Sequence, residues 1–309
     1  MESNDKIMRK KENTLKNLFF ATRPWVFPLA IIQITIGAVS GFWLIGKIDI
    51  IPVVLAAIGL VFLFAFTNII NDYLDFKNGV DKKKRKFQHD HPHPIISNIL
   101  TPRQTLIYGI ILCVVGITFG LVVAFSGRLL VIPIGILAIL MIYGYVGPPF
   151  SLKYKALGEI DVFITNLFIV IAGSYVATGV FTQKEFLVGI PIVSLSTAIL
   201  FANNLRDYKT DLNSRITTLP LKVGFNNATK IYLVLTLLVP YAVLFLSILL
   251  GAAPATTLIA IIMIPFIYRI AKNTIKSAST LKDIVQETAK IATIFGVVYL
   301  AAIIVSLAI

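Results

Sequence analysis

The chain has 309 residues, of which 57% are apolar and only 14% are charged, and its mean hydropathy is +0.86. Soluble domains are about a quarter charged, so this composition excludes an ordinary globular enzyme and indicates a polytopic membrane protein. The net charge of +13 is compatible with nucleic-acid binding, but the positions of the basic residues argue against it. The single cysteine, Cys113, lies in an apolar segment and excludes a disulfide framework.

Long apolar segments dominate the chain after a polar arm over residues 1–22, which lacks the cleavage pattern of a signal peptide. About 20 apolar residues cross a bilayer, and runs this continuous favour helices. We therefore expect residues 23–309 to form one domain, an all-α bundle of nine transmembrane helices around a central cavity that opens to the cytoplasmic face. The predicted spans are 25–45, 51–71, 105–126, 129–147, 160–181, 186–204, 230–250, 255–270 and 290–309.

The basic residues are distributed unevenly between the loops. With nine spans, all but three of the 28 Lys and Arg residues fall on one side, and only Lys47, Arg128 and Lys184 fall on the other. By the positive-inside rule, the N-terminus is expected in the cytoplasm and the C-terminus outside the cell membrane. This asymmetry explains the net charge without a nucleic-acid partner.

Two related polar stretches end the second and sixth spans: FTNIINDYLDFKNGVD over residues 66–81 and FANNLRDYKTD over residues 201–211. Ionisable residues in membrane helices are costly to bury, which makes them functional candidates. The repeat predicts a two-sided site on the cytoplasmic face. Aligning Phe66 with Phe201, an offset of 135 residues, also aligns Asn68 with Asn203, Asp72 with Asp207 and Tyr73 with Tyr208.

The spacing within the two stretches points to a metal. Asn71 and Asp75 are four residues apart, as are Asp207 and Asp211, so each pair shares one helical face. Oxygen ligands of this kind suit Mg²⁺, which usually binds through a few carboxylates plus substrate phosphates. Cations expected on the same face could hold those phosphates. They are Arg23, Lys153, Lys155, Arg206, Arg215 and Lys222.

The stretch from Asn71 to Asp75, followed by Gly79 and Asp81, resembles the first Asp-rich motif of the UbiA superfamily of intramembrane prenyltransferases, and Asp207-x-x-x-Asp211 resembles the second. The resemblance covers nearly the whole chain. It implies transfer of an isoprenyl group from an isoprenyl diphosphate to a lipophilic or aromatic acceptor. It also implies catalytic roles for Asp72, Asp75, Asp207 and Asp211, which with Asn71 would hold Mg²⁺. The diphosphate would be bound by Arg23, Lys153, Arg215, Asn68, Asn203 and Tyr143.

Other local features bear on the acceptor. Gly79 stands where the family's first motif often has a third aspartate, and Asp81 follows two residues later. This Gly-x-Asp form resembles the branch that prenylates dihydroxynaphthoate for menaquinone, as do NNLRD at 203–207 and LGE at 157–159. HPIISN at 93–98 stands where the family usually has Arg-Pro-x-x-Ser-Gly. Hydroxybenzoate and the archaeal-type lipid precursor geranylgeranylglyceryl phosphate stay open as acceptors.

Other interpretations also stay open. A cation-coupled transporter would explain an internal repeat and intramembrane acids, although transporter sites lie near the midplane and these acids gather at one face. A CDP-alcohol phosphotransferase would need a longer Asp-Gly…Ala-Arg…Gly…Asp…Asp pattern. Asp72 and Asp75 could be interfacial counter-charges, and Glu159 and Asp161 could orient Lys153 and Lys155 or contact the substrate. The oligomeric state and the isoprenyl chain length are not readable from the sequence.

Overall fold

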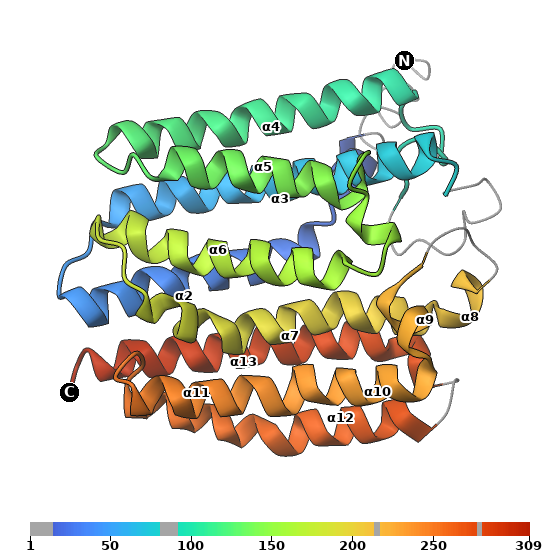
Figure 1. The fold of residues 1–309 in the computed structure, drawn as a ribbon. Coiled ribbons are helices and arrows are strands. Elements are labelled where there is room, and N and C mark those ends of the chain that lie inside the picture. The colour runs from blue at the N-terminus through green and yellow to red at the C-terminus, as the bar shows by residue number, and fades with distance from the viewer. Residues whose placement is uncertain (1–14, 81–91, 213–216, 277–279) are drawn as a thin grey trace, which may run out of the picture. The chain divides into compact units, whose positions relative to one another are not determined.

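The computed structural model describes residues 15–80, 92–212, 217–276 and 280–309, which form helices joined by loops and contain no strand beyond one isolated bridge (Figure 1). The chain divides into two compact units. Unit 1 comprises Met1–Pro28 and Ile58–Phe119, and unit 2 comprises Leu29–Ala57 and Gly120–Ile309. The all-helical architecture predicted from the composition is therefore confirmed for the described residues.

Unit 1 contains the 3-10 turn η1 (Pro24–Val26) and most of the long helices α3 (Ile50–Lys77) and α4 (Pro102–Phe125). The two helices approach closely at Gly116, where a side chain would overlap Leu63 and the Gly59 carbonyl. Small residues allow such contacts in membranes, where packing rather than water exclusion joins helices. The core around them consists of Ala21, Ala65, Ile69 and Leu112 with the half-buried rings of Phe27, Phe62, Phe66 and Tyr108.

Unit 2 holds the remaining helices, together with α2, whose first two residues belong to unit 1. Its elements are α2 (Phe27–Ile45), α5 (Val131–Val146), η3 (Leu152–Tyr154), α6 (Gly158–Thr178), α7 (Lys184–Arg206), α8 (Tyr208–Asp211), α9 (Leu219–Val223), α10 (Phe225–Leu233), the π-helical turn η4 (Val234–Leu238), α11 (Val239–Leu249), η5 (Ala255–Met263), α12 (Ile264–Lys276), η6 (Thr280–Asp283) and α13 (Ile284–Ser306).

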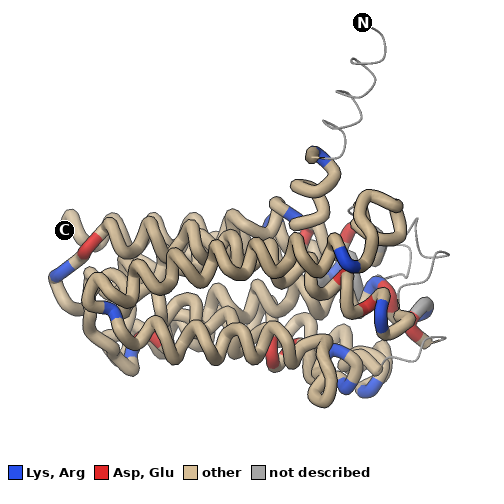
Figure 2. The backbone as a smooth tube through the Cα atoms, turned by 90° about the horizontal axis from the view of Figure 1, so that it is seen from above, with Lys and Arg blue, Asp and Glu red and all other residues tan. Residues whose placement is uncertain are grey.

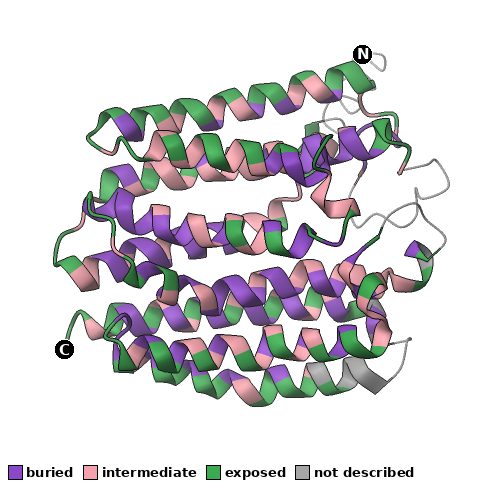
Figure 3. Cartoon of the chain, viewed as in Figure 1, coloured by how far each residue is buried: buried purple, intermediate pink, exposed green. Residues whose placement is uncertain are grey.

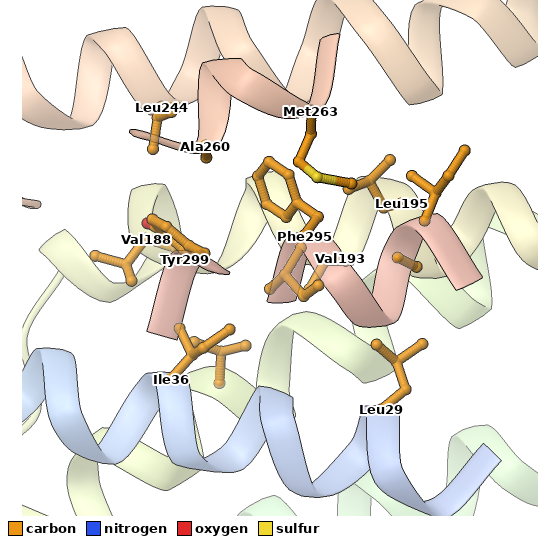
Figure 4. Close-up of a cluster of buried hydrophobic side chains, with 14 of the residues drawn as sticks. Leu29, Ile36, Val188, Val193, Leu195, Leu244, Ala260, Met263, Phe295 and Tyr299 are labelled. Carbon is orange, nitrogen blue, oxygen red and sulfur yellow. The ribbon is translucent and has the colours of Figure 1, made fainter. Parts of the chain in front are cut away.

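Helix α7 is the centre of unit 2 and packs against α6, α11 and α13 (Figure 1). Its residues are among the most buried of the unit (Figure 3). Val188 and Val193 of α7 lie in one apolar cluster with Phe295 and Tyr299 of α13 (Figure 4). The Tyr299 hydroxyl donates a hydrogen bond to the Val188 carbonyl at 3.2 Å, which satisfies a polar group inside the bundle. The helix that ends in the second acidic motif is therefore held on several sides.

Helix α2 packs on α6 through glycines. A side chain at Gly37 would overlap the Val170 carbonyl, and one at Gly173 would overlap the Ile34 carbonyl. The backbones consequently approach more closely than any larger residue would permit.

A buried carboxylate joins three helices of unit 2. Glu185, in the first turn of α7, accepts hydrogen bonds from the hydroxyls of Ser40 on α2 and Ser174 on α6, both at 2.9 Å. Each carboxylate oxygen thus has its own donor, as a buried acid requires. This contact fixes the end of α7 opposite the second motif.

Seven helices in the described part of the chain are long and apolar enough to cross a membrane, and lysines and arginines gather near helix ends and loops (Figure 2). The predicted fourth and eighth spans are apolar helices too, but they are shorter, over Val131–Val146 and Ala255–Ile270. Nine spans and a cytoplasmic cavity therefore stay predictions. The seven long helices are Pro24–Ile45, Ile50–Lys77, Pro102–Phe125, Gly158–Thr178, Lys184–Arg206, Phe225–Leu249 and Ile284–Ser306.

We predict that Gly37→Ala destabilises unit 2 by about 1–3 kcal/mol, because the new methyl group overlaps the backbone of α6. The matched control is Gly135→Ala on α5, where an added methyl group would meet no atom within 4 Å. Thermal unfolding in detergent should show a lower Tm for Gly37→Ala alone. Equal Tm values for the two variants would contradict the close packing of α2 on α6.

Candidate active site

The first acidic motif lies within α3 as far as Lys77, where the helix ends, whereas the hydropathy predicts a helix end near residue 71. Asn71, Asp72 and Asp75 are all buried. Since the helix is unbroken, Asn68 and Asp72 share one face, as do Asn71 and Asp75. The motif therefore presents two pairs of polar groups from one rigid helix.

The α3 face that carries Asn68 and Asp72 binds the turn before η1. Asn68 Nδ2 donates to the Thr22 carbonyl at 2.8 Å, and Arg23 Nη2 pairs with Asp72 Oδ1 at 2.5 Å. Arg23 has a left-handed backbone with φ of 57°, a conformation that costs free energy and persists where the surroundings fix it. The structure thus brings the predicted cation Arg23 to the first motif, within unit 1.

Asn71 offers an acceptor for a ligand. Its Oδ1 atom is buried and has no hydrogen-bond partner among the described residues. Buried polar atoms of this kind nearly always have a partner, so an unsatisfied one calls for a ligand, an ion or water. Asp75 lies one helical turn further along the same face. This pair fits the oxygen ligands that Mg²⁺ prefers.

Gly79 ends α3 in a Schellman motif. The Val80 N–H donates to the Asp75 carbonyl at 2.9 Å and the Gly79 N–H donates to the Phe76 carbonyl at 3.1 Å. Gly79 has φ of +72°, which glycine adopts without strain. An aspartate here, as the related motif often has, would be strained in this conformation. Asp81, the alternative acid, lies outside the described residues.

The HPIISN segment, residues 93–98, forms a turn whose backbone N–H groups bind the buried side chain of His93. His93 Nδ1 accepts hydrogen bonds from the N–H groups of Ile95 and Ile96, both at 3.2 Å, so the neutral ring carries its proton on Nε2. Asn98 has φ of 55°, a region that asparagine tolerates better than most residues, and it stands where the family usually has glycine. His89 and His91 lie outside the described residues.

The second motif begins on α7 and continues into α8. The Asp211 N–H donates to the Asp207 carbonyl at 2.9 Å, so helical spacing continues between the two aspartates. The shared face predicted for this pair is confirmed. Asp211 is buried, whereas Asp207 is partly exposed.

Arg206 neutralises the second motif from within it. Its Nε and Nη2 atoms donate to the two carboxylate oxygens of Asp207 at 2.9 and 3.0 Å, and Nη2 also donates to Asn203 Oδ1 at 2.8 Å. This two-point geometry is the strong form of an arginine–carboxylate pair. Asp72 and Asp207, which correspond in the repeat, are therefore both paired with an arginine.

The loop between α5 and α6 carries the predicted phosphate-binding lysine. Lys153 Nζ lies 6.0 Å from the ring centroid of Tyr145 and 5.9 Å from that of Tyr154, within cation–π range. Ser151 and Ala156, on either side, both have left-handed backbones. The loop is thus held in one strained conformation in which aromatic rings support the lysine.

Glu159 has a role that the sequence did not reveal. This buried residue, in the first turn of α6, accepts a hydrogen bond from Asn204 Nδ2 on α7 at 2.8 Å. It therefore contacts the second motif, next to Asn203. Glu159 and Asn204 are 45 residues apart, and no local pattern signals their pairing.

Some predicted residues are not brought to a common centre. Tyr143 is 46% exposed on α5, and Arg215 lies outside the described residues. Among the described residues, no group of three or more His, Cys, Asp or Glu side chains could hold a metal. Within either unit, a metal would thus depend on amide oxygens and substrate phosphates beside one or two carboxylates.

Together the helices and the two polar clusters define an integral, multi-pass membrane protein with repeat-related Asp and Asn groups at its helix ends. Residues 26–306 match the family model described as the UbiA prenyltransferase family. The chain therefore belongs to the UbiA prenyltransferase family and is a prenyltransferase.

The similarities to relatives and to solved structures agree with this family assignment. The chain is 27% identical over 293 residues to UbiA prenyltransferase domain-containing protein 1 of Dictyostelium discoideum, covering 91% of this chain and 85% of the relative. It is 23% identical over 291 residues to the 1,4-dihydroxy-2-naphthoate octaprenyltransferase of Bacillus subtilis, covering 93% and 92%. Its fold is similar, with a TM-score of 0.65 at 17% identity, to a UbiA homolog from Archaeoglobus fulgidus bound to GPP and Mg²⁺, covering 93% of this chain and 99% of that one.

We predict that Gly79→Ala destabilises the end of α3 by about 1–2 kcal/mol, because an L-residue is strained at φ of +72°. Gly79→Asn is the matched control, since asparagine tolerates the left-handed region and should lose less. Thermal unfolding of the two purified variants measures the difference. An unchanged Tm for Gly79→Ala would contradict the Schellman ending.

Proposed function

We propose that this protein transfers an isoprenyl group from an isoprenyl diphosphate to an aromatic, quinone-type acceptor in the membrane, in a reaction that needs Mg²⁺. The observation that carries the proposal is the repeat itself. Two N-x-x-x-D-Y motifs stand at corresponding helix ends in a chain of the UbiA prenyltransferase family. Each motif supplies amide and carboxylate oxygens at helical spacing.

We assign Mg²⁺ binding to each motif separately, to Asn71, Asp72 and Asp75 in the first motif and to Asp207 and Asp211 in the second. The unsatisfied, buried Oδ1 of Asn71 supports this assignment, as does the Mg²⁺ in the Archaeoglobus relative. When bound, Mg²⁺ stabilises negative charge on the oxygen that leaves with the diphosphate. Asp72 and Asp207 are each paired with an arginine, so a positive guanidinium group lies beside each of these two carboxylates.

Basic side chains of the protein bind and orient the diphosphate in this proposal. Arg23 is positioned by Asp72 and the Thr22 turn, and Lys153 by two aromatic rings. Arg215, Asn68, Asn203 and Tyr143 complete the predicted set. Loss of the diphosphate leaves an allylic cation, which aromatic faces such as Tyr73 and Tyr208 can stabilise. An acceptor carbon or oxygen then forms the new bond and releases a proton.

The acceptor we favour is dihydroxynaphthoate. Two observations support it: the Gly-x-Asp form of the first motif and the similarity to the naphthoate octaprenyltransferase of Bacillus subtilis. Hydroxybenzoate and geranylgeranylglyceryl phosphate are the competing acceptors, and a direct assay separates them.

We predict that Asp75→Asn and Asp207→Asn each lower prenyl transfer by about 100- to 1,000-fold, because an amide keeps the volume but removes the charge that holds the metal. The assay uses purified protein, geranylgeranyl diphosphate and each of the three acceptors, with and without Mg²⁺. Asp49→Asn is the matched control: this acid pairs with Arg128, away from both motifs, and its variant should stay active.

Near-normal turnover by both motif variants would overturn the metal assignment. An active wild-type protein that prefers a different acceptor would overturn only the naphthoate proposal. If no isoprenyl diphosphate is bound or consumed by the wild-type protein, the transporter interpretation would gain support.

We also propose that the active face is cytoplasmic, with the N-terminus inside and the C-terminus outside. The uneven distribution of Lys and Arg between the loops supports this orientation. A protease added to the cytoplasmic side of membrane vesicles should remove an N-terminal tag and leave a C-terminal tag intact. Removal of both tags from that side would contradict the nine-span topology.

A further inference from the structure

Three contacts in unit 2 connect the α5–α6 region to the second acidic motif and the segment after it. The Ala156 N–H donates to the Thr217 carbonyl at 2.8 Å, and the Thr217 N–H donates to the Tyr154 carbonyl at 3.2 Å. The third contact is the hydrogen bond from Asn204 Nδ2 to Glu159 Oε1. The first two place the lysine loop beside Thr217, and the third reaches α7 itself.

Only the third contact uses side-chain atoms. The two main-chain bonds involve no side-chain atom of residues 154, 156 and 217, whereas the Glu159–Asn204 bond needs a side-chain acceptor at position 159 and the amide of Asn204. Glu159 is 5% exposed, so its acceptor is shielded from competing water. A hydrogen bond shielded in this way is electrostatically stronger than one exposed to water.

Asn204 transmits this contact to residues of the motif. It directly follows Asn203, whose Oδ1 atom accepts from Arg206, and Arg206 in turn holds both oxygens of Asp207. One hydrogen bond joins Glu159 of α6 to Asn204, and others join Asn203 through Arg206 to the carboxylate of Asp207. The peptide between Asn203 and Asn204 connects the two sets. Rotation of the last turn of α7 would therefore both break the hydrogen bond to Glu159 and displace Asp207.

We infer that Glu159 is a positioning residue for prenyl transfer: through Asn204 it fixes the orientation of Asn203 and Asp207 relative to the lysine loop. This inference rests on the proposed function for its catalytic meaning. Groups one step removed from a metal ligand often set that ligand's geometry, and their loss typically weakens metal affinity or activity by about 10- to 100-fold. In this role Glu159 acts through Asn204 and not through direct contact with metal or substrate.

The test is steady-state kinetics of Glu159→Ala, Asn204→Ala and the double variant, with Mg²⁺ and geranylgeranyl diphosphate each titrated. Each single variant should raise the half-saturating Mg²⁺ concentration by about 10-fold or more, with a smaller change in kcat. The double variant should be no worse than the single ones, because both remove the same bond. Glu159→Gln should recover most of the loss, since its amide oxygen still accepts from Asn204.

Two matched controls separate positioning from general damage. Asp161→Asn removes the other buried acid in the first turn of α6, so it reports the effect of lost charge at a helix N-terminus. Asn227→Ala removes an asparagine whose Nδ2 donates a hydrogen bond to the Val223 carbonyl at 3.0 Å, between the short helices α9 and α10. Both controls should keep the wild-type dependence on Mg²⁺.

Several outcomes would overturn the inference: an unchanged Mg²⁺ requirement in Glu159→Ala, additive losses in the double variant, or an equal shift in Asp161→Asn. If the wild-type protein transfers no isoprenyl group, the proposed function fails, and a structural measurement still tests the contact. Thermal unfolding of Glu159→Ala, Asn204→Ala and the double variant should show Tm losses that do not add, because both changes remove the same hydrogen bond. Additive Tm losses would refute the contact on which the positioning role rests.

Discussion

A carboxylate buried at the end of an apolar helix must be given a partner, and the architecture of both polar clusters follows from this requirement. The buried Asp72 pairs with Arg23 and the buried Glu159 accepts from Asn204, while the partly exposed Asp207 pairs with Arg206. Arg23, which the turn before η1 brings to Asp72, has a left-handed backbone. The strain at this position is compensated by the electrostatic contact that the turn makes possible.

The two halves of the repeat satisfy the same requirement in different ways. Asp72 takes its arginine from a turn 49 residues earlier, so the first motif needs the chain to fold back before its charge is balanced. Asp207 takes its arginine from the preceding residue, so the second motif is neutralised locally. The second motif in turn depends on α6, through Glu159, for its orientation. Equivalent residues in a repeat therefore do not have equivalent neighbours, and the repeat shares chemistry more than packing.

Much of this could be predicted from the sequence, because long apolar runs and repeated acids are strong local signals. The seven long helices, the helical spacing of Asp207 and Asp211, and the nearness of Arg23 to the first motif belong to this group. The extent of α3 was not predictable from hydropathy, since a helix continues through polar residues once its backbone bonds are in place. The Glu159–Asn204 contact was not predictable either, because it depends on how two helices lie side by side.

The turn at Thr22 and Arg23 has a practical consequence for where the enzyme begins. The family match starts at residue 26, and the hydrophobic run starts at Trp25, so both criteria would place the N-terminal boundary after Arg23. A shortened protein cut at that boundary would keep every membrane helix and lose the guanidinium that balances Asp72, as well as the carbonyl that Asn68 binds. With Asp72 as a metal ligand, as proposed, the minimal catalytic unit is larger than the minimal membrane-embedded one, and its edge is defined by charge and not by hydrophobicity.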